Sequence, residues 1–187
     1  DALQAVSHGA SDGYYAYMGV PSTQAQLSRD NAGKRTFPAF ADGPLNTAEQ
    51  IRELSRMDIP AALSLGPHKT VVHEEPLDSR VIRNNKGRYA VTDATCYADL
   101  VVDDVFLSWD FANGSYLKTF YRFRDFRRER QPVKTFGTWV QIKLTNYKMT
   151  KPKEFDPIAA SAELRKAFDN NLRIFSEFMN NPKKKNK

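Results

Sequence analysis

Two long runs of strand-forming residues flank Asn113-Gly114, and this arrangement constrains the fold more than any other feature of the chain. Tyr97 to Phe111 precedes the dipeptide, and Tyr116 to Arg128 follows it. Asn-Gly is favoured in two-residue type I′ turns, because both central residues of such a turn adopt positive φ. The sequence therefore predicts a β-hairpin in which Ala112 lies opposite Ser115.

The hairpin belongs to a longer region, from about residue 70 onward, in which apolar and polar residues alternate as they do along a strand. Four further segments are expected to be strands: Thr70–Glu74, Ser79–Arg83, Arg88–Asp93 and Thr135–Tyr147. The tetrapeptide Asn84-Asn85-Lys86-Gly87 suits a hairpin turn between the second and the third of them. Along the last strand one face carries Phe136, Val140, Ile142 and Leu144, and the other carries Trp139, Gln141 and Lys143.

Three segments have helical signals. Pro21-Ser22 opens a short helix that runs to about Asn31, and a second begins at Asn46, where Glu49 completes a capping box. The longest begins at Asp156-Pro157, since Asp is a favoured N-cap and Pro a favoured first residue, and it ends before Pro182. Its apolar stripe has helical spacing and consists of Leu164, Phe168, Leu172, Phe175 and Met179.

The elements together predict an α+β fold. We expect an antiparallel meander of about six strands, packed on one long C-terminal amphipathic helix, with two short helices near the N-terminus. The order of elements is similar to that of helix-grip lipid-binding folds, in which a curved sheet wraps a C-terminal helix. The expected organisation is an N-terminal arm at 1–20, a single domain at 21–181 and a basic tail at 182–187.

Composition limits the classes of function. The net charge is +6, but the tail carries four lysines, so the rest of the chain has a net charge of only +2. Nucleic acid is therefore an unlikely partner, because nucleic-acid-binding domains usually carry their charge on the folded surface. No apolar run is long enough to span a bilayer. The chain starts at Asp1, which favours removal of a signal or transit peptide and an extracytoplasmic or organellar location.

The segment from Lys118 to Arg130 interleaves arginines with aromatic residues. In the predicted register Asp103 lies opposite Arg124, Asp99 opposite Arg128 and Trp109 opposite Lys118, which favours a self-paired ladder of opposite charges. Two alternatives remain open. One is an anionic-ligand or protein-partner surface at Arg122, Arg127 and Arg130, and the other is nucleic-acid binding by Arg122, Arg124 and Arg128.

No motif identifies an enzyme. Cys96 is the single cysteine, so an intrachain disulfide and a cysteine-based zinc site are excluded. Asp103 and Asp104 are adjacent on a strand and point to opposite faces, so they need a bulge to share one ion. His68 and His73 lack the spacing of a helical zinc motif. We predict no catalytic residue, metal or cofactor, although residues converging from separate strands leave enzymatic activity open.

Two functions are consistent with these features. The first is a structural or accessory subunit of a larger protein assembly that contacts its neighbours through both ends of the chain. The contact residues would be Tyr14, Tyr15, Tyr17, Lys183, Lys184, Lys185 and Lys187. The alternative is a binder of an apolar small molecule or lipid between the sheet and the C-terminal helix. Its cavity would be lined by Phe106, Tyr121, Phe123, Val140 and Phe168.

Overall fold

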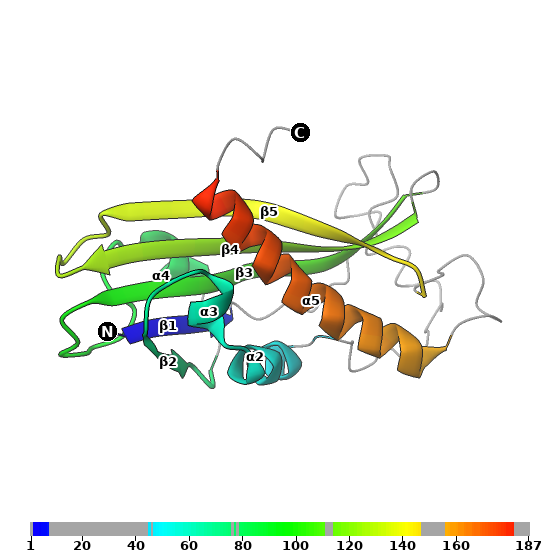
Figure 1. Cartoon of the computed structure of the whole chain (residues 1–187), viewed down its shortest axis with the longest axis horizontal. Coiled ribbons are helices and arrows are strands. Elements are labelled where there is room, and N and C mark those ends of the chain that lie inside the picture. The colour runs from blue at the N-terminus through cyan, green and yellow to red at the C-terminus, as the bar shows by residue number, and fades with distance from the viewer. Residues whose placement is uncertain are drawn as a thin grey trace.

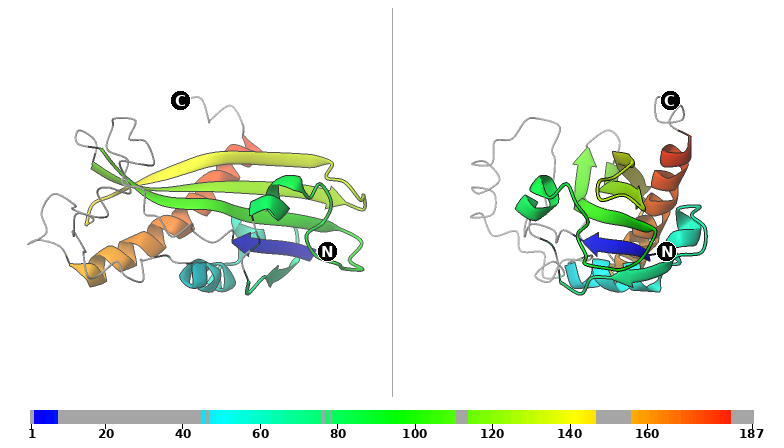
Figure 2. Two further views of the ribbon diagram at one scale, coloured as in Figure 1. Left: turned by 180° about the vertical axis from the view of Figure 1, so that it is seen from behind. Right: turned by 90° about the vertical axis from the view of Figure 1, so that its left-hand side faces the viewer.

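The computed structural model describes residues 2–7, 45, 47–75, 77, 79–110, 114–146 and 156–181. A five-stranded sheet with strand order β2-β1-β3-β4-β5 forms the centre of the molecule. The helix α5 (Pro157–Asn180) crosses one face of the sheet, and the short helix α4 (Ser79–Asn84) lies on the other, as Figures 1 and 2 show. None of the helices described is long and apolar enough to cross a membrane.

The antiparallel part of the sheet confirms the central prediction. It consists of β3 (Tyr97–Asp110), β4 (Gly114–Arg127) and β5 (Lys134–Leu144), which are consecutive in the chain and adjacent in the sheet. Side chains along β5 alternate as expected, with Val140 and Leu144 buried and Trp139 exposed. This three-stranded sheet and the long C-terminal helix together establish the α+β class.

The rest of the sheet differs from a six-stranded meander. The strand β1 (Ala2–Ser7) lies between β2 (Lys69–Val72) and β3 and is parallel to both of them. We expected these N-terminal residues to form an irregular arm. Six residues without strong alternation carry little local signal, and the position of β1 depends on partners far along the chain.

The segment 79–93 also differs from the prediction of two strands joined by a hairpin turn. Ser79–Asn84 is the helix α4, and residues 88–93 have no regular structure. The backbone NH of Asn85 donates to Val81 O at 2.9 Å and ends the helix, and Gly87 NH donates to Asn85 Oδ1 at 2.8 Å. The asparagine-rich tetrapeptide therefore does form a turn, but this turn follows a helix.

The register of the predicted hairpin is wrong as well. Gly114 pairs with Asp110, so the connection consists of residues 111–113, which lie outside the described part, and Gly114 has a φ of +86°. A β-bulge at Asp103 shifts the register once more, and Asp99 lies opposite Arg124. The loop is thus longer than a two-residue turn, and loop length and bulges are what set strand register.

The described helices other than α4 follow local signals. Asp156 caps α5 and accepts from the backbone NH groups of Ile158 and Ala159, and all five residues of the predicted stripe are buried. The helix α2 is Thr47–Arg56. It is followed by α3 (Ile59–Ala62), whose N-cap Asp58 accepts from Ala61 NH at 3.1 Å. The predicted helix near residues 21–31 lies outside the described residues.

Aromatic and aliphatic side chains fill the contact between the sheet and α5. The rings of Tyr121 and Phe175 are 5.2 Å apart, and the Tyr121 hydroxyl donates to Phe168 O at 3.2 Å. Polar side chains enter this core as well: Asn171 is completely buried and donates from Nδ2 to Leu117 O and to the buried Thr119 Oγ1. The helix is thus held by apolar packing and by a specific polar anchor.

Candidate functional site

The sheet face opposite α5, which we call the outer face, carries most of the chemically distinctive side chains. Alternation along β4 directs Lys118, Phe120, Arg122 and Arg124 to this face, since their neighbours Leu117, Thr119, Tyr121 and Phe123 are buried on the α5 side. In the views of Figure 2, α4 and the chain that follows it lie over part of the outer face. A buried ionic cluster lies beneath this covering, and an aromatic cluster lies further along β4.

The ionic cluster is centred on Asp99 and Arg124, which face each other across β3 and β4. Arg124 Nη2 and Nε lie 2.5 Å and 3.1 Å from Asp99 Oδ2. Asp99 has no exposed surface, and Arg124 is only 5% exposed. The pair is therefore shielded from water, where charge-assisted hydrogen bonds are stronger and harder to replace.

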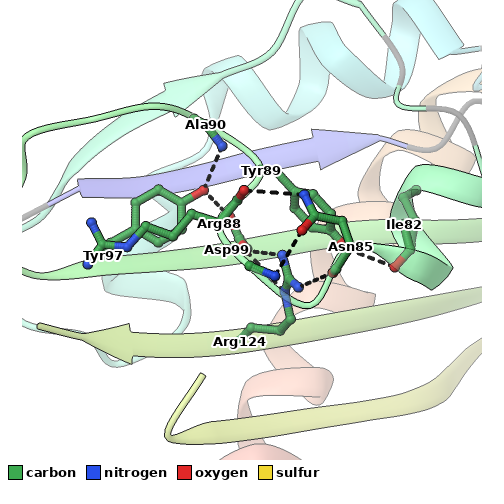
Figure 3. A network of polar contacts seen from close by, with 9 residues as sticks. Ile82, Asn85, Arg88, Tyr89, Ala90, Tyr97, Asp99 and Arg124 are labelled. Atoms are coloured by element: carbon green, nitrogen blue, oxygen red, sulfur yellow. Dashed lines mark hydrogen bonds and ion pairs between the residues drawn. The ribbon is translucent and has the colours of Figure 1, made fainter. Parts of the chain in front are cut away.

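Three further residues complete the cluster, shown in Figure 3. The Tyr97 hydroxyl donates a short hydrogen bond to Asp99 Oδ1 and accepts one from Ala90 NH. Arg124 Nη1 donates to Asn85 O at 2.9 Å, and its guanidinium lies over the Tyr89 ring at 3.9 Å from the centroid. We call Asp99, Arg124, Tyr97, Tyr89 and Asn85 the Arg124 network. It attaches the segment after α4 to the sheet.

The electrostatics of this network suit a structural role. Burial raises the pKa of Asp99, although the hydrogen bond from Tyr97 and the charge of Arg124 act in the opposite direction. Burial and the neighbouring Asp99 carboxylate raise the pKa of Tyr97 well above its usual range, so this hydroxyl stays protonated and donates. Because Asp99 is fully enclosed, these groups act on each other and are not available to a substrate.

The aromatic cluster consists of Phe106, Phe120 and Trp139, one from each antiparallel strand, and we call it the aromatic patch. The ring of Trp139 lies 5.1 Å from that of Phe106 and 5.1 Å from that of Phe120, and it meets Phe106 edge to face. Trp139 remains 46% exposed, and the two phenylalanines are half-buried. Two neighbouring rings thus hold a large aromatic side chain at the surface.

Cations and a glycine border the aromatic patch. Lys118 Nζ lies 5.9 Å from the Phe106 ring centre, and the Arg122 guanidinium lies 5.8 Å from that of Phe120. Gly137 lies beside Phe120, and a Cβ at that position would approach the Phe120 ring to 3.3 Å. An aromatic ring thus covers a glycine on the edge strand β5. Such a ring compensates for the packing that a glycine lacks and stabilises the strand.

The arginines predicted as an anionic-ligand or partner surface do not form one cluster. Arg122 Nη2 forms an ion pair with Asp103 Oδ2 at 2.7 Å in the middle of the sheet. Arg127 lies at the end of β4 with its Nε 3.6 Å from Asp125 Oδ2, and Arg130 is exposed in the turn that follows. Asp103 occupies the bulge, and the adjacent Asp104 is exposed.

The residues predicted to line an apolar cavity are divided between the two faces. Tyr121, Phe123, Val140 and Phe168 are all buried in the core between the sheet and α5. Phe106 pairs with Lys118 and belongs to the aromatic patch on the outer face. The predicted partner contacts at Tyr14, Tyr15, Tyr17 and the lysines of residues 183–187 lie outside the described residues.

Two other kinds of candidate site, a metal site and a groove beside α3, have less support. Among the residues that the structure describes, no group of three His, Cys, Asp or Glu side chains could hold a metal ion. An open groove of about 560 Å³ beside α3 is lined by residues that include Asp58, His68 and Lys69. There His68 Nδ1 lies 2.7 Å from Gly66 O, and Asp58 is occupied as the cap of α3.

The sequence pattern did not identify Tyr89 and Tyr97 as partners of Asp99 and Arg124. The available signal was a tyrosine two residues before an aspartate on one strand, which places the two side chains on one face. Comparison of the chain with models of known protein families and with curated proteins gives no match. The aromatic patch and the Arg124 network are therefore interpreted from their own chemistry.

Proposed function

We propose that this chain is a non-enzymatic accessory subunit that binds a protein partner through the aromatic patch. The observation that carries the proposal is the position of Trp139, which is 46% exposed and held between Phe106 and Phe120. Tryptophan is enriched at the centres of protein interfaces, where a few anchored side chains contribute most of the binding free energy. Pre-ordering the ring lowers the entropy that binding would otherwise cost.

The surroundings of the patch favour a protein over a small molecule. Trp139 lies on the edge strand β5, so a partner can contact the rings and also the outer backbone edge of the sheet. Lys118 and Arg122 provide a polar border like that of protein interfaces. By contrast, packed side chains occupy the contact between the sheet and α5, as the Tyr121, Phe168 and Phe175 contacts illustrate, so that region does not favour a ligand cavity.

The Arg124 network supports the non-enzymatic part of the proposal. Catalytic groups must reach a substrate, whereas Asp99 is fully enclosed and both Arg124 and the Tyr97 hydroxyl are occupied within the protein. The contacts at the two ends of the chain remain predictions that add to this surface.

A photo-crosslinking amino acid in place of Gln141, which is exposed on the same face of β5 as Trp139, tests the proposal in cells of the source organism and keeps the tryptophan in place. We expect one protein to be captured at position 141 and not when the same amino acid replaces Lys166, which is exposed on α5. The captured protein is then purified and titrated against the wild-type chain and Trp139→Ala. A central aromatic anchor predicts binding at least about thirty-fold weaker in the variant. Equal capture at both positions, or unchanged affinity of Trp139→Ala, would contradict the proposal.

A further inference from the structure

A basic turn with exposed apolar tips lies at the end of the sheet where β4 passes into β5. We define the basic turn as Arg128, Arg130 and Lys134, all of which are exposed. Two valines accompany it: Val133 in the same turn is 51% exposed, and Val91 in the segment before β3 is fully exposed. These residues take no part in the aromatic patch or in the Arg124 network.

Hydrogen bonds hold the two segments side by side. Arg88 donates from Nη2 to Glu129 O at 3.2 Å and to Arg127 O at 3.5 Å, and from Nη1 to Ala94 O at 3.3 Å. Val91 lies between the anchored positions 88 and 94. The segment before β3 and the β4–β5 turn also reach the same end of the sheet in Figure 1. The two valine tips and the basic turn therefore belong to one end of the molecule.

Backbone hydrogen bonds also define the turn itself. The backbone NH of Arg127 donates to Asp125 Oδ1 at 2.9 Å, Glu129 NH donates to Phe126 O at 2.8 Å, and Val133 NH donates to Asp125 O at 2.8 Å. Arg127 adopts a left-handed backbone conformation with φ of +47°. Acidic groups are present as well: Asp125 pairs with Arg127, and Glu129 and Asp93 are exposed. The cations still outnumber the acids along the turn.

We propose that this end of the molecule docks on the surface of an anionic lipid membrane. Cations that lie at the level of the headgroup phosphates attract a protein to such a surface, and apolar tips beside them enter the boundary between headgroups and acyl chains. Nucleic-acid bases stack on aromatic rings, and valine side chains cannot provide such stacking. The two exposed tips are valines, so they do not favour a nucleic acid. The combination of cations and valines therefore favours lipid.

Vesicle binding by the full chain tests this inference, with the tail lysines at 183, 184, 185 and 187 changed to glutamine in every protein so that they do not contribute. We expect binding to vesicles of phosphatidylserine and phosphatidylcholine but not to vesicles of phosphatidylcholine alone. Raising NaCl from about 0.1 M to about 1 M shortens the Debye length from roughly 10 Å to roughly 3 Å and should release the protein.

Substitutions separate the basic turn from general charge. Arg128→Gln/Arg130→Gln/Lys134→Gln should weaken binding by roughly a hundredfold. The matched control Arg52→Gln/Lys143→Gln/Lys166→Gln removes the same charge from exposed positions elsewhere and should change it by less than about threefold. Val91→Ser/Val133→Ser should weaken it roughly tenfold without changing its dependence on salt.

The inference is overturned if the protein binds no vesicles, if it binds neutral vesicles equally well, or if the two triple charge variants lose the same vesicle affinity. Tighter binding to single-stranded DNA than to vesicles would also overturn it and would identify nucleic acid as the partner. Circular dichroism of each variant establishes that it is folded. Trp139→Ala should bind vesicles normally, so a failure of this inference is distinguishable from a failure of the proposed protein interface.

Discussion

Replacing Arg124 with methionine tests whether the Arg124 network attaches the segment after α4 to the sheet. The change keeps a long apolar stem and removes the two donors that lie 2.5 Å and 3.1 Å from Asp99 Oδ2. Asp99 has no exposed surface, so water cannot replace them. Removing one partner of such a buried pair costs about 3–5 kcal/mol. Asn85 O loses its donor as well, which adds roughly 1 kcal/mol.

The double variant Asp99→Asn/Arg124→Met gives the decisive comparison. It removes both charges together, so the cost should fall to about 1–2 kcal/mol from lost packing and hydrogen bonds. Arg122→Met is a matched control on the same strand, because the Arg122–Asp103 pair is partly exposed, and it should cost less than about 1 kcal/mol.

Urea unfolding followed by tryptophan fluorescence measures these free energies, and hydrogen exchange of residues 85–96 reports on their attachment. We expect faster exchange in this segment for Arg124→Met than for Arg122→Met. The reasoning fails if Arg124→Met costs no more than Arg122→Met. It also fails if the double variant loses as much stability as Asp99→Asn and Arg124→Met do in sum, since an uncompensated buried charge requires strong coupling between the two positions.

Three further predictions follow from single positions. Asn171→Asp buries a carboxylate against Leu117 O and should lower the free energy of unfolding by at least about 3 kcal/mol. Asn171→Ala should lower it by only about 1–2 kcal/mol, and urea unfolding compares the two variants. Gly114→Ala should cost about 1–2 kcal/mol in the same assay, because φ is +86° and the added methyl would meet Lys143 only at an ordinary contact distance. Burial and the nearby Glu53 raise the pKa of Asp169, against the effect of Arg173, so its stabilising contribution is complete below the unfolded pKa of about 3.9 and is lost as pH rises through the folded pKa. Asp169→Asn should therefore melt at a higher temperature than the wild type at pH 7, with the difference shrinking towards pH 3.

Local signals predicted the elements whose structure depends on neighbouring residues. Asp156-Pro157 placed the start of α5 because a cap and a first-turn proline act within a few residues. Alternation placed Trp139 on the face away from the core for the same reason. Segment 79–84 carries a weaker pattern. Ile82 is buried, Val81 is exposed, and the helical conformation depends on contacts that periodicity does not reveal.

Pairing between strands was the step that local patterns did not predict. The predicted turn places Phe106 opposite Tyr121, but in the structure Phe106 lies opposite Lys118, a shift of an odd number of residues. A register shift by an odd number of residues places a side chain beside the neighbours of the opposite sheet face. For this reason Phe106 belongs to the aromatic patch rather than to the core. Beyond the bulge at Asp103 the shift becomes even, so Asp99 still meets an arginine, Arg124 in place of Arg128.

The position of β1 between β2 and β3 has a consequence for the order of folding. Its partner in β3 begins at Tyr97, opposite Ala2, so the pairing closes a loop of about half the chain. The hairpins β3–β4 and β4–β5 close much shorter loops and lose less chain entropy as they form. The antiparallel strands and α5 should therefore assemble first and leave a vacant slot beside β3, which β1 fills last. A refolding chain would pass through a state with that edge unpaired, the stage at which strand exchange or aggregation threatens it most.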